Sequence, residues 1–218
     1  MIYLRAGLYA EGSSDYHFLM RLVPRLMESI ASTLFPGNHL VEEMVAIDES
    51  DRMKRATRAE RIAAAVAEDA ETIELLIIHS DGAGDPRSAR SNCVEPGIAA
   101  VHAIYGDSPP FAIGCVPVRE IEAWMLTDAE ALRTLGVRPP PSLPTDPERD
   151  RDPKATLGRI LREGGVRRDP EDMYELLGER IDLGTLRGLA AFRAFEAELT
   201  EGVRAVARSQ GVHRSDRP

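Results

Sequence analysis

The sequence predicts an α/β domain with a mainly parallel sheet flanked by helices, followed by a helical appendage. Two observations predict the sheet: short apolar runs alternate with stretches in which apolar side chains recur at helical spacing, and turn-forming residues separate them. A third predicts the appendage, because the chain beyond a proline-rich segment carries only helical patterns. Right-handed crossovers in such a domain bring the carboxyl ends of the strands to one edge of the sheet.

The expected elements follow from the apolar pattern in chain order. Residues 3–10 are strand-like, and Glu-Gly at 11–12 ends the strand with a turn. The next residues, Ser-Ser-Asp, commonly start helices, and apolar side chains then recur at helical spacing as far as Ile30. The other expected elements are a strand over 41–47, a helix with caps among 48–51 and its end near 69, a strand over 73–79, a loop over 80–86, a helix over 96–105, a strand over 111–118 and a helix over 120–135.

Composition suggests the domain boundaries. Residues 1–138 form the expected α/β domain, and residues 139–153 hold six prolines among charged residues, as is typical of a linker or extended loop. Residues 154–208 are expected to form a helical appendage that packs on the first domain and offers a surface for a homodimer or a partner. Residues 209–218 are expected to be a disordered tail.

Charge limits the classes of function. The chain of 218 residues has 27 basic and 36 acidic side chains, and its net charge of −9 argues against coating nucleic acid by bulk attraction. Residues 1–140 carry a net charge of −8 and residues 141–218 only −1. An enzyme acting on nucleic acid stays compatible with this composition, because a metal ion held by clustered carboxylates attracts phosphate.

Other patterns exclude further classes. Cys93 and Cys115 lack the CxxC spacing of zinc and redox sites, and there is no GxxxxGK[ST] phosphate loop. No apolar run approaches the roughly 18 residues of a membrane span, and the first residues do not resemble a signal peptide. We therefore expect a cytoplasmic protein without membrane contact.

Carboxylates follow three of the expected strands at their carboxyl ends, where open α/β sheets bind ligands. They are Glu11 after the first strand, Asp81 and Asp85 after strand 73–79, and Glu120 and Glu122 after strand 111–118. Such a cluster repels itself unless a cation is bound, and oxygen-rich coordination suits Mg²⁺ or Mn²⁺. Glu120 and Glu122 point in different directions on a helix, so one of them is expected to face the cleft.

Four segments carry a family resemblance. Residues 11–15 (Glu-Gly-Ser-Ser-Asp), the aspartate-rich turn 79–85, the segment 116–128 with its Glu-Ala-Trp sequence, and Asp-Pro-Lys at 152–154 are similar to the Toprim-like domains of uncharacterised bacterial proteins. Those proteins are often associated with ATPases and anti-phage loci. The likeness covers residues 11 to about 195, and its specificity comes from the order of the motifs, since Glu-Gly alone is a weak signal.

The resemblance implies roles for particular residues. In Toprim enzymes, which include topoisomerases, primases and the overcoming-lysogenization-defect nucleases, a first-strand glutamate acts in acid/base catalysis and later aspartates hold metal. Glu11 would be the acid/base or a further metal ligand, Asp81 the principal metal ligand and Glu122 another ligand. The usual Asp-x-Asp pattern has Ala83 in its second place here. Asp85 would take over that role if the neighbouring glycines fold the turn back.

Basic residues near these motifs are candidates for binding phosphate. Arg87 and Arg119 flank the acidic loops and could hold phosphate through two parallel hydrogen bonds, or pair with neighbouring acids instead. Lys154 has the same two interpretations, and the resemblance favours phosphate contact.

Structural interpretations exist for several of these side chains. Asp15 and Asp85 have the positions of helix caps. His17 and His79 are interpreted as hydrogen-bonded structural histidines in preference to metal ligands, and Trp124 as a core residue in preference to a base-stacking one.

Together these observations predict a Toprim-like, Mg²⁺- or Mn²⁺-dependent nuclease or related phosphodiester-processing enzyme, an effector of a bacterial anti-phage system. Its substrate would be DNA or RNA, and the sequence leaves one or two metal ions open. The alternative is a catalytically weak binding or regulatory module that acts with a partner ATPase, because Ala83 departs from the family pattern.

Overall fold

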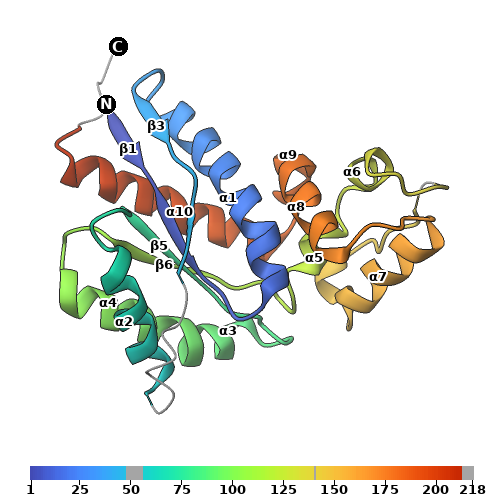
Figure 1. The fold of residues 1–218 in the computed structure, drawn as a ribbon, viewed down its shortest axis with the longest axis horizontal. Coiled ribbons are helices and arrows are strands. Elements are labelled where there is room, and N and C mark those ends of the chain that lie inside the picture. The colour runs from blue at the N-terminus through green and yellow to red at the C-terminus, as the bar shows by residue number, and fades with distance from the viewer. Residues whose placement is uncertain (48–55, 140, 213–218) are drawn as a thin grey trace.

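Four short strands form the central sheet of the computed structural model, which describes residues 1–47, 56–139 and 141–212 (Figure 1). Their order is β4-β2-β5-β6, with every neighbouring pair parallel, and β1 pairs with β3 in a separate parallel ladder. The strands are β1 (Ile2–Leu4), β2 (Ala6–Tyr9), β3 (His39–Val41), β4 (Val45–Ala46), β5 (Leu75–His79) and β6 (Phe111–Cys115). The expectation of a mainly parallel α/β fold is confirmed.

The strand expected over 3–10 is divided at Arg5, where the chain changes partners. β1 pairs with β3, whereas β2 pairs with β4 and β5. The Arg5 carbonyl oxygen accepts a hydrogen bond from the Glu74 N–H at 2.9 Å, and the Arg5 N–H donates to the Glu74 carboxylate at 2.8 Å. These bonds join β2 to the start of β5, the two strands that carry the candidate site.

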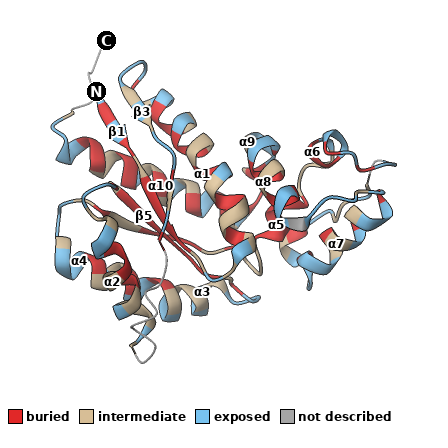
Figure 2. Cartoon of the chain, in the orientation of Figure 1, coloured by how far each residue is buried: buried red, intermediate tan, exposed pale blue. Residues whose placement is uncertain are grey.

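Helices cover both faces of the sheet, and alternate side chains of β5 point to opposite faces, where they pack into two separate hydrophobic cores. Leu75 and Ile77 pack with α1 and α10, whereas Leu76 and Ile78 pack with α2 and α4, and the ribbon of β5 between these helices is coloured as buried (Figure 2). All five residues of β5 are buried. The helices concerned are α1 (Ser13–Leu34), α2 (Arg58–Asp69), α4 (Glu95–Tyr105) and α10 (Ala190–Ser209).

Helix α2 begins with a capping box. The Thr57 hydroxyl accepts a hydrogen bond from the Glu60 N–H at 3.3 Å, and the Glu60 carboxylate accepts one from the Thr57 N–H at 2.8 Å. The caps expected among residues 48–51 lie outside the described residues.

The helix expected over 120–135 is interrupted, because Asp128 starts a new one. Its carboxylate accepts hydrogen bonds from the N–H groups of Glu130 and Ala131, both at 2.9 Å. The two pieces are α5 (Glu122–Met125) and α6 (Ala129–Thr134). Trp124 of α5 is fully buried, which confirms its interpretation as a core residue.

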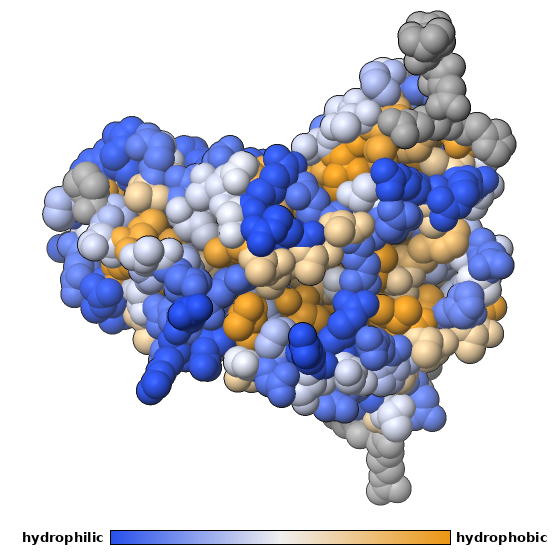
Figure 3. Space-filling model, turned by 180° about the vertical axis from the view of Figure 1, so that it is seen from behind, coloured by the Kyte–Doolittle hydropathy of each residue, from blue (hydrophilic) through white to orange (hydrophobic). Residues whose placement is uncertain are grey.

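Helices α5 to α9 gather at one end of the molecule in a helical lobe (Figure 1). Its helix α8 packs along α1. Among the described residues, no helix is long and apolar enough to cross a membrane. Seen from behind, the hydrophobic patches of the surface lie mostly over the sheet part and are separated by hydrophilic side chains (Figure 3). The remaining helices of the lobe are α7 (Pro153–Glu163), α8 (Pro170–Arg180) and α9 (Leu183–Leu186).

The region expected as an appendage, 154–208, divides between this lobe and the sheet. Helix α10 returns to the sheet and covers β6, because its apolar side belongs to the same core as α1. At its close, the Gln210 side chain accepts a hydrogen bond from the Tyr3 N–H at 2.8 Å and donates one to the Tyr3 carbonyl at 2.9 Å. Residues 209–212 of the expected tail are thus held in place, and 213–218 lie outside the described residues.

The strand order fixes where a ligand would bind. From β2 the chain proceeds to β4 on one side and then returns past β2 to β5 on the other. In open α/β sheets this reversal of direction opens a crevice beyond the carboxyl ends of the two central strands. Here the reversal lies between β2 and β5, and we call the region beyond the carboxyl ends of these two strands the crevice.

Candidate metal centre

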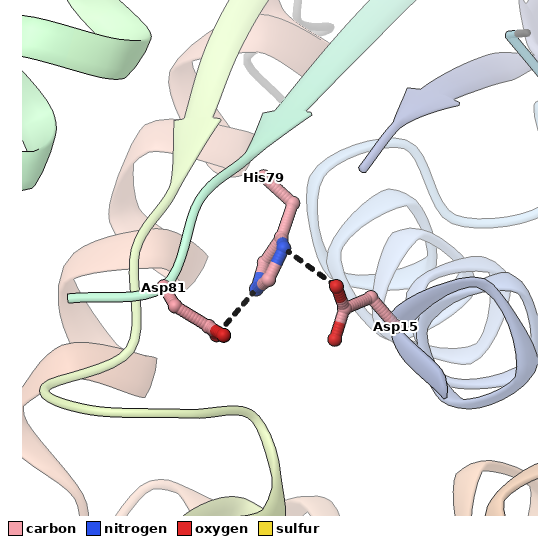
Figure 4. Close-up of side chains that lie close together, drawn as sticks. All are labelled: Asp15, His79 and Asp81. Atoms are coloured by element: carbon pink, nitrogen blue, oxygen red, sulfur yellow. Dashed lines mark ion pairs between the residues drawn. The ribbon is translucent and has the colours of Figure 1, made fainter. Parts of the chain in front are cut away.

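Three side chains from the ends of β2 and β5 come together at this crevice. Asp15 lies in the first turn of α1, His79 is the last residue of β5, and Asp81 follows two positions later. One ligand atom from each lies within 4.8 Å of the others. Figure 4 shows the His79 ring between the two carboxylates. This group, Asp15, His79 and Asp81, could hold a metal ion, and we call it the metal triad.

The local sequence fixes Asp15. The turn after β2 places Gly12 at the N-cap of α1, and the Gly12 N–H donates a hydrogen bond to the Asp15 carboxylate at 3.0 Å. The Asp15 side chain therefore reaches back over the strand end instead of into solvent, and only 5% of the residue is exposed. Asp15 is thus the third residue of α1 and not its N-cap as expected, and its carboxylate is buried at the crevice.

His79 is the central member of the metal triad. It is fully buried, and neither ring nitrogen has a hydrogen-bond partner among the described residues. Nδ1 lies 3.5 Å from the Asp15 carboxylate and Nε2 lies 3.8 Å from that of Asp81. Burial lowers the pKa of His79 to about 4, and nearby Arg58 adds to the lowering against the opposing charge of Glu11. The imidazole is therefore neutral at pH 7, the form that binds metals.

Both carboxyl groups of the metal triad resist ionisation. Burial raises the pKa of Asp15 to about 6, with the Glu11 charge adding to the rise and the Gly12 N–H and Lys154 opposing it. The pKa of Asp81 is raised to about 7. Burial is the largest cause, and repulsion from four neighbouring carboxylates adds to it, those of Asp15, Glu122, Glu120 and Glu11. A divalent ion would relieve this repulsion.

Glu11 lies beside the metal triad and is held by a hydrogen bond and an ion pair. Its carboxylate accepts a hydrogen bond from the Ser80 hydroxyl at 2.9 Å and pairs with the Arg58 guanidinium at 2.7 Å. Arg58 also donates to the His79 carbonyl at 2.8 Å and to the Cys93 carbonyl at 3.1 Å. Arg58 thereby ties Glu11 to the end of β5 and fixes the direction of its carboxylate.

Replacing Arg58 by alanine is expected to lower the free energy of unfolding by about 1–3 kcal/mol, because hydrogen bonds of a charged, mostly buried group are lost. Lysine at this position is expected to recover only a minor part, since an ammonium cannot reproduce the guanidinium fork. Urea unfolding measures both variants. Equal stability of Arg58→Ala and the parent protein would show that the contacts of Arg58 do not hold the strand ends together.

Glu122 connects the site to the helical lobe. It is 2% exposed, and its Oε1 accepts a hydrogen bond from the Tyr174 hydroxyl at 3.2 Å and lies 3.6 Å from the Lys154 ammonium. Burial raises the pKa of Glu122, and burial together with Glu122 raises that of Tyr174. Lys154, expected as a phosphate contact, is therefore near the acidic cluster, where it pairs with Glu122.

The loop after β5 turns Asp85 away from the metal triad. Gly82 packs so closely that a Cβ there would lie 2.2 Å from the Pro117 carbonyl oxygen. The Ala83 N–H donates to the Arg119 carbonyl at 3.1 Å, and Ala83 has a φ of 48°. Asp85 emerges exposed and accepts a hydrogen bond from the Ser88 N–H at 3.1 Å, as the N-cap of α3 (Pro86–Ala89). Its interpretation as a cap is confirmed, and the structure does not bring it into the metal triad.

The other expected contacts lie around the rim. Arg87 is exposed on α3. The Arg119 guanidinium lies against Gly84, where a Cβ would be 3.1 Å from it. His17 is not part of the metal triad. Its ring contacts the carboxylates of Glu171 at 3.4 Å and Glu175 at 3.0 Å on α8, in line with a structural role.

The structure thus adds two residues to the site that the sequence assigned to other roles. Asp15 had the pattern of a helix starter, and His79 that of a structural histidine. Signals for both exist in the sequence: Asp15 lies four positions after Glu11, just beyond the first strand, and His79 is an ionisable residue directly after four apolar residues of a buried strand. Of the expected carboxylates, Glu11, Asp81, Glu120 and Glu122 converge on one region, so both glutamates lie near Asp81 where one of the two was expected.

No protein-family model matches the chain, and no curated protein or solved structure matches it significantly.

Proposed function

We propose that the protein is a Toprim-like, metal-dependent nuclease or related phosphodiester-processing enzyme. The observation that carries this proposal is the metal triad, surrounded by further carboxylates in the crevice beyond β2 and β5. Clustered carboxylates with a neutral imidazole are a suitable ligand set for a divalent ion, for which the sequence suggested Mg²⁺ or Mn²⁺. The four-stranded parallel sheet, with Glu11 directly after β2, is compatible with the Toprim resemblance.

A divalent ion, when bound, would polarise a phosphoryl oxygen, lower the pKa of a coordinated water and neutralise developing charge. Asp15, His79 and Asp81 would hold it. Glu11 would act as general acid or base, and two contacts support this role, because Arg58 and Ser80 hold its carboxylate beside the metal triad while leaving the side chain 41% exposed.

Phosphate binding would fall to basic residues at the rim of the site. Lys154 pairs with Glu122 yet remains 59% exposed, so its ammonium can also reach a substrate. Arg119 and Arg87 border the loop after β5. DNA or RNA is the proposed substrate, and the net charge of −9 makes binding without a divalent ion weak. The resemblance adds the proposal of an effector role in anti-phage defence.

A second candidate is a catalytically weak binding or regulatory module that acts with a partner ATPase, in monomeric or homodimeric form. One observation favours it: Ala83 occupies the second aspartate position, and Asp85 caps α3 instead of turning to the metal triad.

Cleavage assays separate the two candidates. With Mg²⁺ or Mn²⁺ the purified protein is expected to nick or degrade DNA or RNA, and Glu11→Gln and Asp81→Asn are each expected to lower the rate by about 100-fold or more. The matched control is Asp107→Asn, the same chemical change at an exposed residue in the loop that precedes β6.

Asp85→Ser adds a sharper comparison. Serine can still accept the Ser88 N–H and cap α3, so this variant removes the carboxylate alone. Unchanged cleavage would assign Asp85 to capping only. If the parent protein does not cleave with either ion and forms a stable complex with an ATPase, the regulatory module is correct and the nuclease is not.

A further inference from the structure

We propose that the metal triad takes a first-row transition-metal ion, bound through an imidazole nitrogen of His79, in preference to Mg²⁺. The inference rests on the proposed function for the location of the site, and deepens it by naming the class of ion. It follows from the surroundings of His79, from the spacing of the three ligand atoms and from the chemistry of the donors.

His79 lacks the partners that a buried imidazole needs. It is fully buried, and neither nitrogen has a hydrogen bond among the described residues. A buried polar group without a hydrogen-bond partner lowers the stability of the fold by about 1–3 kcal/mol. A structural histidine would normally donate to a backbone carbonyl or a carboxylate within hydrogen-bonding distance, as His39 does to Glu28 at 2.8 Å elsewhere in this chain. The absence of such a bond at His79 indicates that its partner is a ligand.

The spacing in the metal triad fits an ion better than a hydrogen bond. The His79 nitrogens lie 3.5 Å and 3.8 Å from the nearest oxygens of Asp15 and Asp81, too far for a good hydrogen bond. Ligand atoms about 2.0–2.2 Å from a common ion lie about 3–4.4 Å from one another, depending on the angle between them. One ion can use only one ring nitrogen of His79, and the metal triad offers one nitrogen and one oxygen from each aspartate that all lie within 4.8 Å of one another, so that binding an ion requires these atoms to move together.

The donor set selects the ion. Mg²⁺ prefers oxygen ligands in an octahedron and keeps several waters, whereas imidazole nitrogen suits transition-metal ions. Affinity of nitrogen-containing sites rises along the series Mn²⁺, Fe²⁺, Co²⁺. A neutral imidazole with two carboxylates therefore favours these ions over Mg²⁺, and leaves coordination positions open for water and substrate.

The test begins with the full-length protein after removal of metal by a chelator. Calorimetric titration with Mg²⁺, Mn²⁺ and Co²⁺ is expected to give affinities that rise in that order, with Mn²⁺ bound at least about tenfold more tightly than Mg²⁺. Electron spin-echo spectroscopy of the Mn²⁺ form is expected to show coupling to an imidazole nitrogen.

Two histidine variants make the test specific. His79→Asn is expected to abolish the nitrogen coupling and to bring the affinities for Mn²⁺ and Mg²⁺ together. His17→Asn, whose histidine is engaged by carboxylates of α8, is expected to keep both the coupling and the preference. Circular dichroism reports whether each variant folds, and the coupling in the parent protein needs no variant at all.

Absence of nitrogen coupling in the parent protein, or equal affinities for Mg²⁺ and Mn²⁺, would overturn this inference. Its failure is distinguishable from failure of the proposed function. Cleavage with Mg²⁺ and no nitrogen coupling would leave the nuclease standing without an imidazole-bound ion. Mn²⁺ bound through His79 without cleavage would support the inference and remove the nuclease.

Discussion

Replacing Asp15 or Asp81 by asparagine is expected to abolish tight binding of divalent ions and, at pH 8, to stabilise the metal-free protein. Both effects have one cause, which is the crowding of buried carboxylates around His79. An ion would need these negative charges as ligands, whereas the metal-free fold is weakened by them. Asparagine removes the charge and keeps nearly the same shape.

The size of the stability effect follows from burial. Asp15 is 5% exposed and its pKa is about 6 instead of 3.8. A shift of about two units corresponds to roughly 3 kcal/mol against the ionised form. Because the asparagine amide must itself be hydrogen bonded, we expect a net gain of about 1–2 kcal/mol for Asp15→Asn at pH 8. The gain for Asp81→Asn is smaller, since its carboxylate is 38% exposed and solvent screens the repulsion.

The pH dependence has a definite sign. A carboxyl group whose pKa is raised by folding contributes stability below its ordinary pKa, and this contribution is lost as pH rises through the folded value. The stability contributed by Asp15 is therefore lost between about pH 4 and pH 6, and that contributed by Asp81 between about pH 4 and pH 7. His79, with its pKa lowered to about 4, acts oppositely, because its stability contribution is lost as pH falls below 6.5.

Metal binding is therefore expected to strengthen between pH 6 and pH 8, where protons leave Asp81, while the metal-free protein weakens over the same range. Urea unfolding at several pH values, with a chelator and with Mn²⁺, measures both trends. An ion at 100 times its dissociation constant should add about 2.7 kcal/mol to the parent protein. Asp107→Asn serves as the control and should respond to metal like the parent. If Mn²⁺ stabilised Asp15→Asn and Asp81→Asn as much as it stabilises the parent protein, these residues would be excluded as ligands.

Replacing Trp124 by alanine is expected to lower the free energy of unfolding by about 3–5 kcal/mol, the largest effect on stability that the structure suggests. Trp124 is fully buried. Its ring meets Phe192 edge-on at 5.1 Å and stacks on Phe195 at 6.0 Å between centroids, and both phenylalanines belong to α10. The residue thus joins α5, which carries Glu122, to the long helix that covers the sheet.

Urea unfolding of Trp124→Ala and Trp124→Phe tests this role. Phenylalanine keeps an aromatic contact with α10 and leaves a smaller cavity, so we expect a loss well below that of alanine. The slope of the unfolding transition should remain that of the parent if the two variants unfold from a native fold. A loss below about 1 kcal/mol for Trp124→Ala would mean that the region collapses around the missing ring.

The sequence alone was sufficient for the parallel α/β class and for the carboxylates at the strand ends, but the strand expected over 41–47, like the one over 3–10, is in fact two short strands, β3 and β4, that pair with different partners. Apolar runs such as 75–78, and the polar residues that follow them, are local signals, and the rules of parallel α/β sheets place their ends together. Glu11, Asp81 and the pair Glu120 and Glu122 were found in this way, and the choice of Glu122 within that pair came from the resemblance. The Toprim resemblance and the catalytic roles that it implies remain predictions.

The tertiary structure decided what each carboxylate does. Close packing of Gly82 on the backbone at 117–118 sends Asp85 to cap α3, and a lobe formed by distant residues brings Tyr174 and Lys154 to Glu122. His79 became a candidate ligand because its ring is buried between two aspartates without a hydrogen bond. Burial and the charges of neighbours set protonation and coordination, and both depend on contacts between residues far apart in the chain. For that reason the sequence determined that acidic residues gather at the carboxyl ends of the strands, and only the folded structure, which brings Asp15 and His79 to Asp81 and leaves Asp85 as a helix cap, identified those that can share an ion.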